Sequence, residues 1–162
     1  MLFDEIKLRD VRLRNRIVVS PMCQYSAQDG HVTDWHLVHL GKFAQGGAGV
    51  VFVEATAVEK RGRITHGDTG IWDDSHIGGL RRIAEFVKSQ GAVPALQLAH
   101  AGRKASVHRP WNGGAPLRPD EPGNLLPLAA ARPQRVDLAA PPDDEALAER
   151  TRETRVAGCR ES

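Results

Sequence analysis

The sequence contains very little cysteine. Its 162 residues include only Cys23 and Cys159, which lie far apart in unlike surroundings. Small disulfide-stabilised domains and zinc ribbons need several cysteines at short, regular spacings. Neither class is therefore expected, and a reducing cytoplasm is the expected compartment.

The sequence also lacks a strong charge of one sign and long apolar runs. The formal net charge is +2, with acids and bases interspersed, so neither nucleic acid nor another polyanion is an expected partner. No apolar run approaches the roughly 20 residues that span a bilayer. The first residues lack the basic-then-apolar layout of a signal peptide. We therefore expect no membrane partner.

Aromatic residues are absent after Trp111, and eight of the ten prolines lie between Pro110 and Pro142. Beyond Leu117 there is also no lysine or isoleucine. Such a segment has little to bury, which favours disorder apart from a weak helix around residues 145–155. We therefore predict a folded domain over residues 1–117 and a Pro/Ala/Arg-rich tail over residues 118–162.

The folded part alternates strands with helices. A hairpin turning at Arg9-Asp10 is expected first, followed by apolar strands at residues 17–20, 49–53 and 93–98. Helices are expected from Thr33 or Asp34 to Gly46-Gly47, and from residues 73–75 to Gln90-Gly91. Strands of the doubly buried type that alternate with helices indicate an α/β fold with parallel strands and right-handed crossovers.

Polar side chains collect where these strands end, at residues 20–25, 54–56 and 97–103. In parallel α/β folds the carboxyl ends of the strands form the ligand-binding edge, so these three segments are expected to share one site. No Gly-x-Gly-x-x-Gly and no Walker-type motif follows the first strand, which argues against a Rossmann dinucleotide domain.

Several motifs, in order and at matching spacing, resemble the old yellow enzyme family of FMN-dependent ene-reductases. Residues 15–25 read NRIVVSPMCQY and are similar to the bacterial branch, which carries cysteine in this loop. Residues 53–58 (VEATAV), 62–65 (GRIT), 70–72 (GIW) and 97–104 (QLAHAGRK) continue the resemblance, which covers residues 1–117.

The resemblance implies an FMN site with NAD(P)H as the reductant and an activated alkene, such as an enone, as the small-molecule substrate. Cys23 would tune the flavin redox potential through its contact, since hydride transfer needs no thiolate. Tyr25 would face the substrate, and the full-length family leaves a homo-oligomer open. The residues implied to bind the cofactor are Ser20, Pro21, Met22, Cys23, Ala55 and Gln97.

Simpler roles remain open for several residues. A cysteine such as Cys23 also serves as a small buried hydrophobe. His36 and His39 have no third ligand at a suitable spacing, so helix capping or core packing is expected in place of metal binding, and no metal site is expected. Glu54 is expected to be a partnered structural carboxylate. His100 either lines the pocket or makes a structural hydrogen bond.

A TIM (β/α)8 barrel typically has about 250 residues, whereas this sequence supplies only its first three βα units after the N-terminal hairpin. The resemblance places the family's histidine pair, proton-donating tyrosine and phosphate-binding arginine on later strands. A truncation, such as a frameshift after Leu117, is therefore a hypothesis, with weak flavin binding as its consequence. The alternatives are a non-catalytic remnant or interaction fragment that does not retain flavin, and an unrelated open α/β nucleotide-binding domain.

Overall fold

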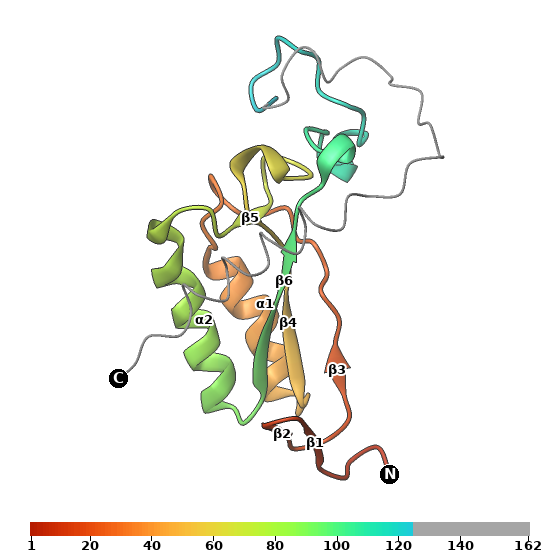
Figure 1. Cartoon of the computed structure of the whole chain (residues 1–162), viewed down its shortest axis with the longest axis vertical. Helices are drawn as coiled ribbons and strands as arrows, with labels where there is room; N and C mark the ends of the chain where they lie inside the picture. The colour runs from red at the N-terminus through yellow and green to blue at the C-terminus, as the bar shows by residue number, and fades with distance from the viewer. Residues whose placement is uncertain (125–162) are drawn as a thin grey trace, which may run out of the picture. The chain divides into compact units, whose positions relative to one another are not determined.

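The computed structural model describes residues 1–124, and the predictions for residues 125–162 lie outside this part (Figure 1). The chain begins with a hairpin of strands β1 (Ile6–Leu8) and β2 (Val11–Leu13), paired antiparallel. Arg9 in the turn has φ 53°, the left-handed conformation that tight turns use. The predicted hairpin is confirmed.

A parallel sheet of four strands follows: β3 (Val18–Val19), β4 (Val50–Ala57), β5 (Thr69–Gly70) and β6 (Val93–Ala99). Strand β4 is central, because β6 pairs along its whole length on one edge. The other edge is shared: β3 pairs with its first residues and β5 with its last. The predicted parallel strands linked by helices are confirmed.

Helices α1 (Asp34–Gln45) and α2 (Ile77–Ser89) pack on the sheet (Figure 1). The core lies between them and β4, where Leu40, Val51, Ile83 and Val87 are buried. Apolar residues recur at helical spacing on the inner faces of both helices, and this burial holds the layers together. Both helices end where the sequence predicted, with Gly46 following α1 and Gly91, at φ 77°, following α2.

The start of the second helix differs from the prediction. A 3₁₀ turn, Asp74–His76, precedes α2, and the Asp73 carboxylate accepts the Ser75 N–H. The cap at Asp73 is therefore real, but it opens the 3₁₀ turn, and the α-helix begins only at Ile77. A local cap signal marks where a helical segment begins without specifying which helix type it begins.

Two strand predictions also need correction. The first strand has only two residues, and Val18 is 52% exposed, so it is not buried on both faces. Its only strand partner within residues 1–124 is β4, which leaves its other edge uncovered there. The second strand does not stop at Val53, because β4 continues through Glu54 and Thr56 to Ala57.

Arg14 connects the hairpin to the ends of both helices. Its guanidinium donates to the carbonyl oxygens of Ala44 and Ala48, at and beyond the end of α1, and of Gln90 after α2. Carbonyl groups at helix C-termini lack partners within the helix and carry partial negative charge, so a cation suits them. The hairpin is thereby tied to the amino-terminal edge of the sheet.

The segment after β6 contains two 3₁₀ turns, Gly102–Lys104 and Pro110–Asn112. Leu117 is buried and donates its N–H to the Ser106 carbonyl, and the Asn124 side chain donates to the Leu117 carbonyl. The domain boundary expected after Leu117 remains a prediction. Within residues 1–124, no helix combines the length and the apolar character needed to cross a membrane.

Candidate functional site

The strand ends meet as expected from a parallel sheet. The β4–β6 register places Ala55 opposite Gln97. Cys23, in the loop after β3, interacts through its thiol with the backbone of Ala55. The three segments singled out in the sequence therefore converge at the carboxyl end of the sheet.

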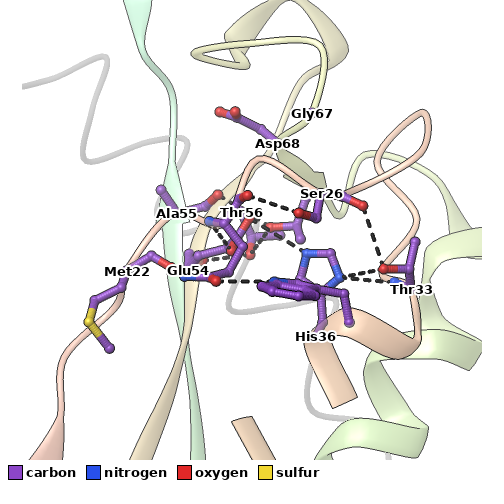
Figure 2. A network of polar contacts seen from close by, with 12 residues as sticks. Met22, Ser26, Thr33, His36, Glu54, Ala55, Thr56, Gly67 and Asp68 are labelled. Atoms are coloured by element: carbon purple, nitrogen blue, oxygen red, sulfur yellow. Dashed lines mark hydrogen bonds and ion pairs between the residues drawn. The ribbon is translucent and has the colours of Figure 1, made fainter. Parts of the chain in front are cut away.

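The residues that precede Cys23 in the loop lie largely at the surface. Ser20 and Met22 are exposed, and Pro21 between them is half-buried. Figure 2 shows the Met22 side chain pointing away from the buried polar groups behind the loop. Gln97 on β6 is also exposed. Ser20, Met22 and Gln97 are therefore accessible from solvent.

Cys23 is half-buried, and its surroundings favour the neutral thiol. Burial raises the pKa of Cys23, and the nearby carboxylates of Glu54 and Asp68 raise it further, while a hydrogen bond with the Ala55 backbone opposes them. The side chain is thus neither a fully buried hydrophobe nor an activated nucleophile. It presents a polarizable, uncharged sulfur.

Tyr25 closes the loop in a left-handed conformation, with φ 51°. Its ring meets Trp111 edge to face, with centroids 5.9 Å apart, so residues from two distant loops form one aromatic wall. Burial and the neighbouring Cys23 and Asp68 raise the pKa of the Tyr25 hydroxyl, which therefore remains protonated at neutral pH. Gly67 packs so closely on the Tyr25 carbonyl that any Cβ at position 67 would overlap it.

A buried polar network supports the loop from behind (Figure 2). The Gln24 N–H donates to Glu54 Oε2 at 2.7 Å, and Glu54 is only 3% exposed. His36, at the start of α1, lies on the other side of Glu54, with its Nε2 3.8 Å from Glu54 Oε1. The expectations of a partnered Glu54 and a capping His36 are confirmed, since His36 Nδ1 accepts the Thr33 N–H.

A second network holds the segment between β4 and β5. The Asp68 carboxylate accepts the N–H groups of Ile64 and Thr65 and the Thr65 hydroxyl. The hydroxyl oxygens of Thr56 and Thr69 are 3.0 Å apart, and the hydrogen bond between them joins β5 to β4. Burial raises the pKa of Asp68, although these hydrogen bonds favour the ionised form. The sequence predicted Asp68 only as a loop residue, from its place among Thr, Gly and Arg residues, and gave no signal of this network.

His100, which follows the end of β6, has structural partners. His100 Nδ1 accepts the Gly102 N–H, and its Nε2 lies 3.4 Å from a Glu59 oxygen. Of the two open interpretations, the structural hydrogen bond is therefore observed. No group of three or more His, Cys, Asp or Glu side chains that could hold a metal ion occurs within residues 1–124.

The model of the NADH:flavin oxidoreductase / NADH oxidase family matches residues 1–120. The chain belongs to this family. Two curated relatives are an NADH:flavin oxidoreductase of Gibberella zeae, 52% identical over 110 residues, and an NADPH dehydrogenase of Bacillus cytotoxicus, 51% identical over 109 residues. The alignments cover 68% and 66% of this chain but only 27% and 32% of the relatives. The chain thus spans about a third or less of the curated relatives it matches.

Solved structures of the NADH:flavin oxidoreductase family agree. Old Yellow Enzyme from Pichia sp. AKU4542 superposes with a TM-score of 0.62 at 27% identity, covering 65% of this chain and 28% of that one. Morphinone reductase superposes with a TM-score of 0.59 at 29% identity, covering 64% and 27%. The resemblance and the fold class, βα units of a TIM barrel after a hairpin, are confirmed.

Proposed function

We propose that the described residues form the part of an FMN site that binds the isoalloxazine ring, in an NAD(P)H-dependent oxidoreductase that reduces activated C=C bonds of enone-type substrates. One observation carries the proposal: Cys23, Ala55 and Gln97 come together at the carboxyl end of the sheet. Membership of the NADH:flavin oxidoreductase family supports flavin as the ligand.

The side chains at the strand ends fit a flat, weakly polar ring. Ala55 offers a small side chain that lets a ring approach the sheet, and Gln97 offers an exposed carboxamide for the pyrimidine edge. Ser20, Pro21 and Met22 directly precede Cys23 in the same loop and would contact the ring beside it. The thiol of Cys23 is held neutral, so it contacts the ring without adding charge. These groups match an aromatic heterocycle better than they match a metal ion or a phosphate.

When bound, FMN supplies hydride transfer between NAD(P)H and the alkene. The residues of this chain bind and orient. Cys23 tunes the electronics of the ring by contact, and Tyr25, backed by Trp111, faces the substrate with a protonated hydroxyl. The loop after β3 shields one side of the ring from water.

A titration with two flavins tests the proposal. Lumiflavin has the ring without the ribityl phosphate, so a site that holds only the ring binds lumiflavin and FMN alike. We expect the purified chain to quench the fluorescence of both with similar weak affinity. Gln97→Ala removes the carboxamide that pairs with the ring and weakens both by about tenfold, the loss of one or two hydrogen bonds.

Gln45→Ala is the matched control, because Gln45 is an exposed carboxamide at the end of α1, away from the strand ends. It leaves both affinities unchanged. Quenching that is absent for both flavins, or that Gln97→Ala and Gln45→Ala change equally, contradicts the proposal. Preference for FMN by more than tenfold contradicts a site limited to the ring.

The finer expectations belong to this proposal: a small-molecule alkene as substrate, a cytoplasmic location, a possible homo-oligomer, a partial barrel domain at residues 1–117 and a truncation after it. The comparisons do not favour the alternative of a non-catalytic fragment, since the family match extends over residues 1–120 and so includes the ends of all the described strands. They also give no support to an open nucleotide-binding domain.

A further inference from the structure

His36 and Glu54 form a buried pair with one unsatisfied atom on each side. The side chains are 1% and 3% exposed, and they face each other across the space behind the Cys23 loop (Figure 2). His36 Nε2 and Glu54 Oε1 are 3.8 Å apart, which is too long for a hydrogen bond. Neither atom has another hydrogen-bond partner within residues 1–124. Leaving two buried polar atoms unpaired is costly, so the arrangement needs a reason.

The tautomer of His36 follows from its other nitrogen. The Thr33 N–H donates to Nδ1 at 3.0 Å, and an N–H can donate only to a nitrogen that carries no proton. The neutral imidazole then carries its proton on Nε2, which is aimed at Glu54. The N-terminal cap of α1 thereby fixes the direction of a donor that lies inside the site.

The Glu54 carboxylate faces a hydrogen-bond donor on each of two sides. Its Oε2 accepts the Gln24 N–H at 2.7 Å, and its Oε1 faces the His36 donor. Gln24 directly follows Cys23, so this bond fixes the backbone beside the thiol. The carboxylate thus lies between the loop that carries Cys23 and the first turn of α1.

We propose that Glu54, oriented by His36, is the positioning residue for Cys23: it clamps the backbone of the loop to β4 and holds a carboxylate beside the thiol. This inference rests on the proposed function for the identity of the ligand, but its physical content does not involve flavin. The clamp connects the first turn of α1 to the surface on which a ligand lies.

The charged and titratable groups around Cys23 come from three segments. Glu54 lies on β4, Asp68 in the loop before β5, and Tyr25 in the same loop as the thiol. Both carboxylates favour the neutral thiol. Replacing Glu54 by glutamine therefore changes two independent properties: the protonation of Cys23 and the anchoring of Gln24.

The test measures the rate at which Ellman's reagent modifies Cys23 across pH, in the full chain with Cys159→Ser so that one thiol remains. In this background Glu54→Gln lowers the apparent pKa of the thiol. It also raises the limiting rate at high pH by about fivefold, because one carboxamide oxygen cannot serve both donors and the loop loosens. Glu59→Gln, which replaces a half-exposed carboxylate just beyond β4 that pairs with Arg61, changes neither value.

Two substitutions of His36 separate positioning from packing. His36→Asn retains an acceptor near the Nδ1 position for the Thr33 N–H but has nothing that reaches Glu54, so the limiting rate rises by about fivefold. His36→Gln retains a donor near the Nε2 position, and the rate stays close to that of the Cys159→Ser parent. Equal rates for the two variants would mean that His36 serves only the fold, and the proposal is then wrong.

The unsubstituted chain gives a second readout that requires no variant to fold. We expect the Gln24 amide to exchange with solvent at least tenfold more slowly than the Met22 amide, although both lie in the same loop. Equal exchange at the two positions contradicts the clamp. Because neither assay contains flavin, a failure to bind FMN refutes the proposed function and leaves this inference standing.

Discussion

Arg14 Nη1 donates to the Gln90 carbonyl oxygen at 2.7 Å, across 76 positions of the sequence. The same guanidinium bonds the carbonyls of Ala44 and Ala48, so one side chain joins the hairpin to the C-terminal ends of both helices. The planar, five-donor geometry of arginine suits several carbonyl acceptors at once. This contact makes the amino-terminal edge of the sheet a single unit.

Replacing Arg14 by alanine is expected to lower the free energy of unfolding by at least about 2 kcal/mol, because several carbonyl groups lose a charged donor. Arg14→Lys is expected to recover only part of this free energy, since one ammonium group cannot reproduce the planar set of five donors of a guanidinium. Arg12→Ala, an exposed residue of the same hairpin, costs less than about 0.5 kcal/mol. Urea unfolding measures all three, and equal effects at positions 12 and 14 contradict the role of Arg14.

Gly78 and Gly79 stand side by side in the first turn of α2 but differ in their surroundings. A Cβ at Gly78 meets nothing within 4 Å, whereas one at Gly79 lies 2.6 Å from Val32 Cγ2. Gly78→Ala is expected to raise the free energy of unfolding by up to about 1 kcal/mol. Gly79→Ala has the same favourable effect on helix propensity, but its Cβ also clashes with Val32. The Gly79→Ala variant is therefore expected to be less stable than the Gly78→Ala variant. Thermal unfolding of the two variants compares them, and the reverse order contradicts the packing.

Asp68→Asn is expected to destabilise the chain by about 1–3 kcal/mol, because its amide group faces an N–H that the carboxylate accepted. Asp73→Asn is the control: asparagine caps a helical turn as well as aspartate does, so stability is unchanged. Chemical unfolding monitored by tryptophan fluorescence gives both values. A harmless Asp68→Asn is the result that would refute the network.

The dependence of stability on alkaline pH provides a further test. The folded chain raises the pKa of Cys23 above its ordinary 9.0 and that of Tyr25 above its ordinary 10.0, chiefly through burial. Each neutral form is therefore favoured by folding, and the stability linked to it is present below the ordinary pKa and lost as the pH rises through the raised one. Urea unfolding between about pH 8 and pH 11 should show a decline that Cys23→Ser and Tyr25→Phe each reduce. A decline that neither variant alters assigns it to other groups.

The sequence predicted the helices and the longer strands well, because their apolar residues repeat with a clear period. It missed β5, since Thr69–Gly70 is too short to show a period and is held by the Thr56 hydroxyl and the edge of β4. It ended the second strand at Val53 because Glu54 looked too polar for a buried strand. Only a partner 30 positions away, the Gln24 N–H, makes that burial possible.

The rule that ligands bind at the carboxyl ends of parallel strands located the three segments of the candidate site. The individual residues Cys23, Ala55 and Gln97 were implied by the family resemblance, and the structure brings them together. The supporting groups did not follow from the rule or from the resemblance. The local sequence predicts that His36 caps a helix. It gives no sign that the Nε2 atom of His36 faces Glu54, which lies 18 residues later on β4. Contacts of this kind depend on how the layers pack, which a linear pattern does not encode.

The change of neighbour along β4 has a consequence for how this scaffold can vary. On one edge of β4, the first residues pair with β3 and the last residues pair with β5. The chain therefore leaves this edge of the sheet after Val19, and a later segment returns to it at Thr69. The segment between Lys60 and Asp68 connects β4 to β5 without contributing to the core beneath α1 and α2. Because Thr65 and Asp68 are buried and Gly67 packs on Tyr25, insertions or deletions there are expected to change the candidate site and to leave the packing of the helices on the sheet unchanged. Substitutions in this interval are therefore a route by which natural selection or a protein engineer can change the candidate site while the helices and the core stay the same.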